Sequence, residues 1–286
     1  MKILVTGANG QLGKSIKKIS KLFPEHKFIY TDVNELDITN SDQVLSFFKN
    51  NSPEFCINAA AYTNVDKAET EQELNNKINI IGPSNLAKSC KESNAKLIHI
   101  SSDYVYNNNN QETMTEDSAT LPNGIYAQSK LKGEQEVVKN LDEYYIIRTS
   151  WLYSEFGHNF VKTIIKLCQE RKELKVVNDQ IGSPTYATDL AIAILKIINL
   201  NNNKFGIYNY SDAGIISWYD FANKIVEISE LDCKITPIPS SEFPTKAPRP
   251  LNSRLSKEKI VKSFNIVIPE WENSLKKCIE QLENFC

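Results

Sequence analysis

The chain has 286 residues, of which 41% are hydrophobic and 24% charged, and its formal net charge is -2. This composition is typical of a globular protein and excludes disordered chains and the strongly basic surfaces that bind nucleic acid. No apolar run reaches the about 20 residues that span a bilayer, and the apolar N-terminal segment lacks the basic start and cleavage site of a signal peptide. We therefore expect a cytoplasmic protein that binds neither membranes nor nucleic acid.

Cysteine and histidine are too scattered in the sequence to indicate a metal site or a disulfide framework. There is no Cys-x-x-Cys pair, and the histidines are isolated from one another. His99 falls in an apolar strand pattern, where a packed and hydrogen-bonded side chain is expected. We predict reduced structural thiols, no catalytic histidine and no metal ligands. The six cysteines are Cys56, Cys90, Cys168, Cys233, Cys278 and Cys286.

The first element in the chain is a strand pattern at residues 3–5 that leads directly into the sequence TGANGQLG at residues 6–13. Gly7 permits a tight turn, Gly10 lets the backbone approach a pyrophosphate, and Gly13 lets a helix pack against the sheet. Apolar residues then recur at helical spacing over residues 11–22. A strand, a glycine turn and a helix N-terminus in this order indicate a phosphate-binding site.

Strand and helix patterns alternate through the first half of the chain. Strands are expected at 27–30, 55–58, 96–100 and 144–147, and helices at 41–50, 70–92 and 125–140. This alternation predicts an α/β protein with a doubly wound parallel sheet, the Rossmann fold.

The alternation loosens from Trp151, and prolines cluster between residues 237 and 250. We expect a dinucleotide-binding domain at residues 1–150. A smaller C-terminal subdomain at residues 151–286 should bind mainly the substrate, with some segments returning to the first domain. The asparagine runs 107–110 and 201–203 are expected to be surface loop tips.

Tyr126 and Lys130 stand four residues apart, so on a helix they share one face. An ammonium group near a phenol favours the ionised phenol and lowers its pKa, which makes tyrosine a usable proton donor to a carbonyl oxygen. Taken alone, such a pair is more often a surface pair. Ser101 and Ser102 end the strand at 96–100, at the sheet edge where α/β folds bind ligands, and serines there either cap a turn or bind the same oxygen.

Three motifs together resemble the extended short-chain dehydrogenase/reductase family. They are Thr-Gly-x-x-Gly-x-x-Gly from residue 6, Ser-Ser-x-x-Val-Tyr at 101–106 and Tyr-x-x-x-Lys at 126–130. Further segments are similar to the branch of this family that reduces the C4 ketone of dTDP-4-dehydro-β-L-rhamnose to dTDP-β-L-rhamnose for polysaccharide synthesis. These segments lie at 35–39, 58–69, 148–153, 179–185, 217–222 and 249–255, so the resemblance covers nearly the whole chain.

The resemblance implies a hydride transfer from NADPH or NADH, with Tyr126 as proton donor, Lys130 lowering the tyrosine pKa and holding the nicotinamide ribose, and Ser102 orienting the ketone. Asp32 closes the second strand, where an acid binds the ribose 2'-hydroxyl and favours NADH. The implied cofactor contacts are Thr6, Gly7, Asn9, Gly10, Gln11, Leu12, Gly13, Asp32, Asp37, Ile38, Ala59, Ala60, Ala61, Tyr62, Tyr126 and Lys130. The implied sugar-nucleotide contacts are Val65, Ser102, Tyr104, Tyr126, Trp151 and Arg249.

Two other functions share parts of this pattern. A 4-epimerase or 4,6-dehydratase of the same extended family would keep the glycine turn and the Ser-Tyr-Lys set, but a dehydratase should carry a second acid where Tyr104 follows Asp103. A regulatory subunit that only binds nucleotide would have less need of the full catalytic set. Some relatives bridge a dimer through magnesium held by acids, whereas Ser15 occupies the comparable position here. A monomer or a homodimer is therefore expected, without metal.

Overall fold

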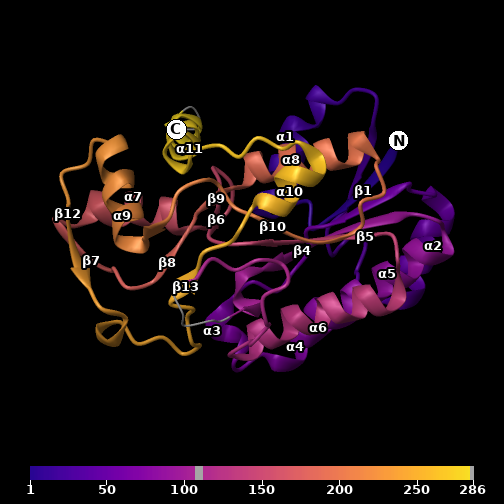
Figure 1. Ribbon diagram of the computed structural model, residues 1–286, viewed down its shortest axis with the longest axis horizontal. Coiled ribbons are helices and arrows are strands. Elements are labelled where there is room, and N and C mark those ends of the chain that lie inside the picture. Colours follow the sequence, from indigo (N-terminus) through magenta and orange to yellow (C-terminus); the bar gives the residue numbers. More distant parts are fainter. Residues whose placement is uncertain (107–111, 284–286) are drawn as a thin grey trace.

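The computed structural model describes residues 1–106 and 112–283. The expected loop at 107–110 and the thiol of Cys286 lie outside this range. The described chain forms a central sheet covered by helices on both faces and a smaller lobe beside the carboxyl ends of the strands (Figure 1).

The central sheet contains six parallel strands in the order β10-β5-β4-β3-β1-β2. From β1 the chain moves outward to β2 on one side, then returns to β3 on the other, which is the reversal that opens a ligand crevice in Rossmann folds. The doubly wound parallel sheet expected from the sequence is confirmed. The strands are β1 (Lys2–Thr6), β2 (Lys27–Tyr30), β3 (Phe55–Asn58), β4 (Lys96–Ser102), β5 (Tyr144–Thr149) and β10 (Gly206–Tyr210).

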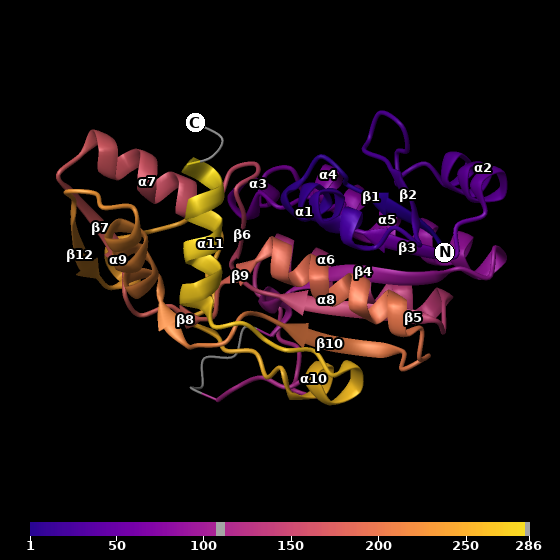
Figure 2. The same cartoon turned by 90° about the horizontal axis from the view of Figure 1, so that it is seen from above.

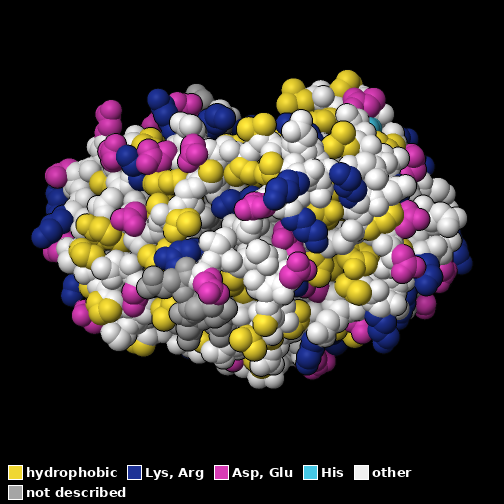
Figure 3. Space-filling model, in the orientation of Figure 1, with side chains coloured by type: hydrophobic (Ala, Val, Ile, Leu, Met, Phe, Trp, Pro, Cys, Tyr) yellow, Lys and Arg dark blue, Asp and Glu magenta, His cyan; other side chains and the backbone are white. Residues whose placement is uncertain are grey.

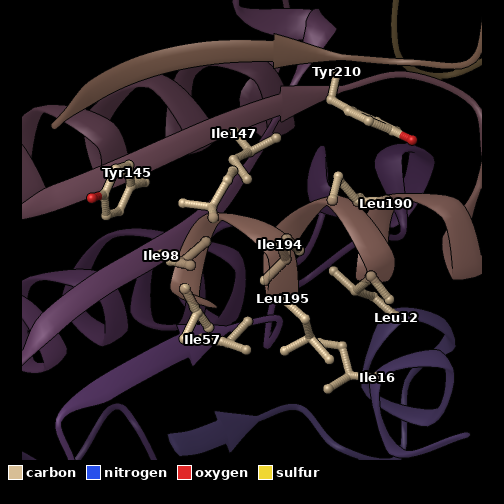
Figure 4. Packing of buried hydrophobic residues seen from close by; sticks show 14 of the residues in the cluster. Leu12, Ile16, Ile57, Ile98, Tyr145, Ile147, Leu190, Ile194, Leu195 and Tyr210 are labelled. Atoms are coloured by element: carbon tan, nitrogen blue, oxygen red, sulfur yellow. The ribbon is translucent and has the colours of Figure 1, made fainter. Parts of the chain in front are cut away.

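Two hydrophobic layers hold helices against the opposite faces of this sheet. Helices α1 (Gln11–Ile19), α8 (Ala187–Leu200) and α10 (Glu258–Phe264) cover one face. Their apolar side chains, such as Ile16 and Ile194, form one cluster with those of the strands, such as Ile57 (Figure 4). Each fully buried Ile or Leu contributes about 1.5–3 kcal/mol relative to an exposed one. The other face carries α2 (Ser41–Asn51), α5 (Gly82–Glu92) and α6 (Ile125–Asn140).

Two expected helices differ in detail from the structure. The helix expected at 11–22 ends at Ile19 and continues as a 3-10 turn, Ser20–Leu22. The helix expected at 70–92 begins as α4 (Gln72–Asn76), widens into a π-helical turn at Lys77–Ile81 and continues as α5. In the π turn, Asn79 donates to the carbonyl of Tyr62 and to the hydroxyl of Ser129 on α6. The π turn therefore carries a polar contact between this helix and α6.

The second half of the chain builds the smaller lobe around its own hydrophobic cluster (Figure 2). Helix α9 begins with a capping box in which Ser217 and Asp220 exchange hydrogen bonds. The lobe contains α7 (Phe160–Glu170), β7 (Glu173–Val177), α9 (Trp218–Ile228), β12 (Lys234–Ile238) and α11 (Trp271–Glu283). Short strands link it to the sheet: β6 (Leu152–Tyr153), β8 (Ile181–Gly182), β9 (Thr185–Tyr186), β11 (Ile216–Ser217) and β13 (Asn252–Ser253).

The chain passes between the two parts several times. Strand β10 pairs with β5, and α8 and α10 pack on the central sheet, although all three follow residue 150. Basic and acidic side chains are interspersed over the face shown in Figure 3. No helix formed by the described residues is both long and apolar enough to cross a membrane.

Candidate active site

The glycine turn after β1 packs backbone against backbone. Gly7 has a φ of 65°, and a Cβ built on it would lie 2.6 Å from the backbone nitrogen of Ala60, directly after β3. A Cβ on Gly13 would lie 2.5 Å from the Cα of Ala8. A side chain therefore does not fit at either position. The backbone of the turn stays close to its neighbours and leaves the N–H groups at the N-terminus of α1 free to bind an anion. This cradle fits the pyrophosphate of a dinucleotide.

A cavity of 390 Å³ opens beside this turn at the carboxyl ends of β1, β2 and β3. Ala59, Ala60 and Ala61 form one wall with little side-chain bulk, which leaves room for a flat ring. Of the expected cofactor residues, the structure brings together here Gly7, Asn9, Gly10, Asp32, Asp37, Ile38, Ala59, Ala60 and Ala61. The sequence analysis did not identify four further lining residues, Val33, Leu36, Thr39 and Ile78.

The other expected cofactor residues have different surroundings. The hydroxyl of Thr6 donates to Asn58, and Leu12 packs in the hydrophobic core. The side-chain oxygen of Gln11 accepts from Ser154 and Asn159 and so ties the turn to the second half of the chain. The hydroxyl of Tyr62 donates to Glu71 at 2.7 Å. None of these four residues lines the cavity.

Asp32 lies between two cavities. One carboxylate oxygen accepts from the backbone N–H of Asn9 at 2.9 Å, and the other from that of Val33 at 2.8 Å. Beyond Asp32 lies a second cavity of 610 Å³, which the sequence analysis did not predict. Lysines at helical spacing on α1 line it, and this spacing is the signal that could have revealed them. They are Lys14, Lys17 and Lys18, and Lys21 in the following 3-10 turn lines the cavity as well.

The catalytic candidates converge at the end of β4. Ser102 is the last residue of β4, while Tyr126 and Lys130 lie on one face of α6. All three are buried, and the ammonium of Lys130 donates to the backbone carbonyl of Ile100 at 2.8 Å. Glu69 accepts from the N–H of Ile125 at 2.9 Å and thereby fixes the first turn of α6.

Burial controls the titration of the two α6 residues. Burial raises the pKa of Tyr126 to about 12, the nearby Ser102 hydroxyl lowers it in part, and Asp103 raises it further. Burial lowers the pKa of Lys130 to about 8, and the negative charge of Glu134 offsets part of this by raising it. The ammonium of Lys130 is bonded to the Ile100 carbonyl, and the lowering of the tyrosine pKa by Lys130 stays a prediction. Tyr126 keeps its proton at neutral pH.

Asp103 joins the catalytic serine to the second half of the chain. Its carboxylate accepts from the Ser102 hydroxyl at 3.0 Å and from the Ser253 hydroxyl at 2.5 Å. The residue is 3% exposed, and this burial raises its pKa to about 6, although the serine hydrogen bonds lower it. The contact of Asp103 with Ser253 could not be predicted from the sequence, because Ser253 lies 150 positions away along the chain.

Replacing Asp103 with asparagine should remove one contribution to the pH dependence of stability. A buried acid with a raised pKa stabilises the folded state when protonated, and that contribution is lost as pH rises from about 4 to about 6. We expect wild type to lose on the order of 2–3 kcal/mol more than the variant over this window. Urea unfolding at pH 4 and pH 7 gives the free energy of unfolding of both proteins. An equal change of this free energy between the two pH values in wild type and variant would contradict the prediction.

Some of the residues expected to bind the substrate line a cavity of 720 Å³ between the sheet and the smaller lobe. Tyr104, Trp151 and Arg249 line it, and Tyr104 packs edge-on against Tyr126 with ring centroids 5.4 Å apart. Val65, Ser102 and Tyr126 do not line it. Tyr104 therefore connects this cavity with the catalytic tyrosine.

A second tryptophan extends the aromatic wall of the substrate cavity. Trp218 stacks on Trp151 with ring centroids 3.8 Å apart and an interplanar angle of 15°. Trp151 has a φ of 49°, a strained conformation for a bulky residue, which the stacking and the close approach of Gly182 hold in place. The sequence analysis did not assign Trp218 to the site, although its motif at 217–222 carried part of the resemblance.

The remaining histidine, cysteine and metal expectations concern positions outside these cavities. His99 is 1% exposed and bonds to the Asn58 side chain at 3.0 Å, so the packed histidine is confirmed. The five cysteines in the described part of the chain are buried free thiols. Ser15 is buried and its hydroxyl donates to the carbonyl of Gln11. Within residues 1–106 and 112–283, no three acids, histidines or cysteines lie close enough together to hold a metal ion.

Fold and site together define a dinucleotide-dependent oxidoreductase of the extended short-chain dehydrogenase/reductase class. The family profile described as the RmlD substrate binding domain matches residues 1–284. The chain is also 38% identical to dTDP-4-dehydrorhamnose reductase of Aggregatibacter actinomycetemcomitans, over 96% of this chain and 97% of that protein. The chain belongs to the RmlD substrate binding domain family, and the resemblance seen in its motifs is confirmed.

Solved structures agree with this assignment over the full length of the chain. A dTDP-4-dehydrorhamnose reductase from Clostridium acetobutylicum is 44% identical with a TM-score of 0.95, covering 99% of this chain and 100% of that one. A dTDP-4-dehydrorhamnose reductase from Bacillus anthracis, solved in complex with NADP, is 40% identical with a TM-score of 0.93, covering 98% and 99%.

Proposed function

We propose that this chain is a cytoplasmic reductase that converts dTDP-4-dehydro-β-L-rhamnose to dTDP-β-L-rhamnose, the last step of dTDP-rhamnose biosynthesis, with NADPH or NADH. The observation that carries the proposal is the buried set of Ser102, Tyr126 and Lys130, with Tyr126 packed on Tyr104 of the 720 Å³ cavity. The names of the relatives supply the substrate. Buried free thiols fit a reducing compartment.

The residues of the site perform the proton half of a ketone reduction. A bound nicotinamide supplies the hydride to C4. Tyr126, held protonated by burial, donates its proton to the developing alkoxide oxygen and completes the alcohol. Lys130 lies one helical turn away and stabilises the phenolate that remains, because opposite charges attract strongly in a buried site. The Ser102 hydroxyl orients the ketone.

The cofactor lies along the glycine turn and the 390 Å³ cavity in this proposal. Asp32 would accept hydrogen bonds from the ribose hydroxyls of NADH, as acids at the end of the second strand of such folds do. The lysines of α1 in the neighbouring cavity attract the additional phosphate of NADPH, and this supports use of both cofactors. The NADP complex of the Bacillus anthracis relative supports the same assignment.

The substrate is held mainly by the second half of the chain. Trp151 provides a flat face for a ring, and the planar guanidinium of Arg249 suits the diphosphate. We assign residues 1–150 to the dinucleotide and 151–286 mainly to the sugar nucleotide, with β10, α8 and α10 completing the first domain. The enzyme works as a monomer or homodimer without a bridging metal.

The test is an assay of purified protein with the 4-keto sugar nucleotide, in which the absorbance of NADPH or NADH falls as the ketone is reduced. Parallel reactions with dTDP-linked and UDP-linked ketones define the nucleotide. We expect net oxidation of the cofactor and a product with a hydroxyl at C4. Interconversion of two sugar nucleotides without net oxidation would indicate an epimerase, and cofactor binding without turnover a regulatory subunit.

A further inference from the structure

The segment at 239–251 joins β12 to β13 and forms part of the wall of the substrate cavity. Residues 241–246 are exposed, and the aromatic ring of Phe243 is 58% exposed. Ala247 is buried in contrast, at 1% exposure. The wall is therefore anchored at its C-terminal part, close to Arg249.

The carboxylate of Asp66 holds this part of the wall in place. An oxygen of Asp66 accepts from the backbone N–H of Ala247 at 3.1 Å, and its second oxygen accepts from the guanidinium of Arg249 at 2.7 Å. The same guanidinium donates to the carbonyl of Ala247 at 3.4 Å. Asp66 thus fixes both the backbone of the wall and the charged group that faces the cavity.

The element that carries Asp66 also touches the catalytic helix. Asp66 lies in the short helix α3 (Val65–Ala68), and Glu69 directly after it accepts from the N–H of Ile125 at the start of α6. The charges of Arg249 and Asp66 act on Tyr104 with opposite sign, Arg249 lowering its pKa and Asp66 raising it, while burial raises it most. The ion pair therefore lies beside the tyrosine that packs on Tyr126.

We propose that Asp66 is a positioning residue, which holds Arg249 and the wall at 247–249 in the arrangement that binds the diphosphate of the sugar nucleotide. The inference rests on the proposed function. A long arginine side chain loses considerable freedom on binding an anion, and a partner that fixes it beforehand lowers this cost. The pair is part-buried, with 21% of the Arg249 side chain and 40% of the Asp66 side chain exposed.

The variant Asp66→Asn separates positioning from simple charge attraction. The amide oxygen of asparagine can still accept from Ala247, but the amide nitrogen then takes the place of the oxygen that binds Arg249, and it donates and cannot accept. If Asp66 only neutralised Arg249, the variant would leave a free positive charge and bind a diphosphate more tightly. If Asp66 positions Arg249, the variant binds the diphosphate more weakly. The two roles therefore predict opposite changes.

The experiment measures binding of thymidine diphosphate by calorimetry, together with kcat and KM for the 4-keto sugar nucleotide. For Asp66→Asn we expect binding about tenfold weaker and KM about tenfold higher, with kcat and NADPH affinity within about twofold of wild type. In Asp66→Asn combined with Arg249→Ala, the loss should equal that of Arg249→Ala alone. Glu258→Gln, which breaks an exposed pair with Lys262 on α10, should change neither quantity.

Unchanged or tighter diphosphate binding in Asp66→Asn would overturn the inference, as would additive losses in the double variant. Asp66→Ser, which keeps a small polar side chain but no charge for Arg249, gives the same test if the asparagine variant does not fold. Absence of turnover in the wild-type enzyme overturns the proposed function instead. Calorimetry with thymidine diphosphate needs no turnover, so the two failures are distinguishable.

Discussion

Replacing Tyr126 with phenylalanine is expected to lower kcat by about 10²–10⁴-fold, the usual contribution of a general acid. The substitution removes the phenolic proton and keeps the ring. The edge-on packing against Tyr104, with centroids 5.4 Å apart, is therefore preserved. Since Tyr126 is 9% exposed and its pKa is raised to about 12, the protonated phenol is the species removed.

Steady-state kinetics with the 4-keto sugar nucleotide measure this loss, and calorimetry should show that NADPH and thymidine diphosphate still bind. Tyr145→Phe is the matched control. Tyr145 lies in β5, and its buried hydroxyl has no hydrogen-bond partner in the described part of the chain. Its removal should leave kcat unchanged. A Tyr126→Phe enzyme within about fivefold of wild-type kcat would contradict the assignment of Tyr126 as proton donor.

The central sheet could be predicted from the sequence because its first five strands are short, largely apolar runs separated by helices. Residues 27–30 and 55–58 form strands with the expected bounds, while β4 and β5 extend two residues further than expected. The sixth strand, β10, was not predicted. Its sequence, GIYNY, follows a polar loop in a region without regular alternation, and its place beside β5 depends on α8 crossing the sheet. Local patterns do not contain that information.

The candidate site likewise contains residues that could be predicted from the sequence and residues that could not. Gly7, Tyr126 and Lys130 belong to short motifs whose geometry is set by one turn or one helix, so the combination of these motifs in the sequence indicates their chemistry. The partners that complete the site are distant in sequence. Asp66 meets Arg249 across 183 positions, and Asp103 meets Ser253 across 150. These contacts arise only when the second half of the chain folds against the sheet.

One buried ion pair lies beside Lys130, the lysine of the candidate site. Glu134, one helical turn after Lys130, accepts three hydrogen bonds from Arg148 in β5, at 3.0 Å, 3.3 Å and 2.6 Å. The two side chains are 2% and 3% exposed. Arg148 also donates to Tyr106 at 2.8 Å and lies over its ring at 4.7 Å from the centroid. This network joins α6 to the end of the sheet.

Replacing Glu134 with alanine should lower the free energy of unfolding by about 3–5 kcal/mol, because the charge of Arg148 would remain buried without its partner. Urea unfolding at pH 7 measures this loss. Replacing Glu258 in its exposed pair with Lys262 should cost less than about 1 kcal/mol. The double replacement of Glu134 and Arg148 by Met and Leu should be more stable than Glu134→Ala, since it leaves no unpaired charge. A Glu134→Ala protein as stable as the Glu258→Gln control would show that Arg148 finds another acceptor.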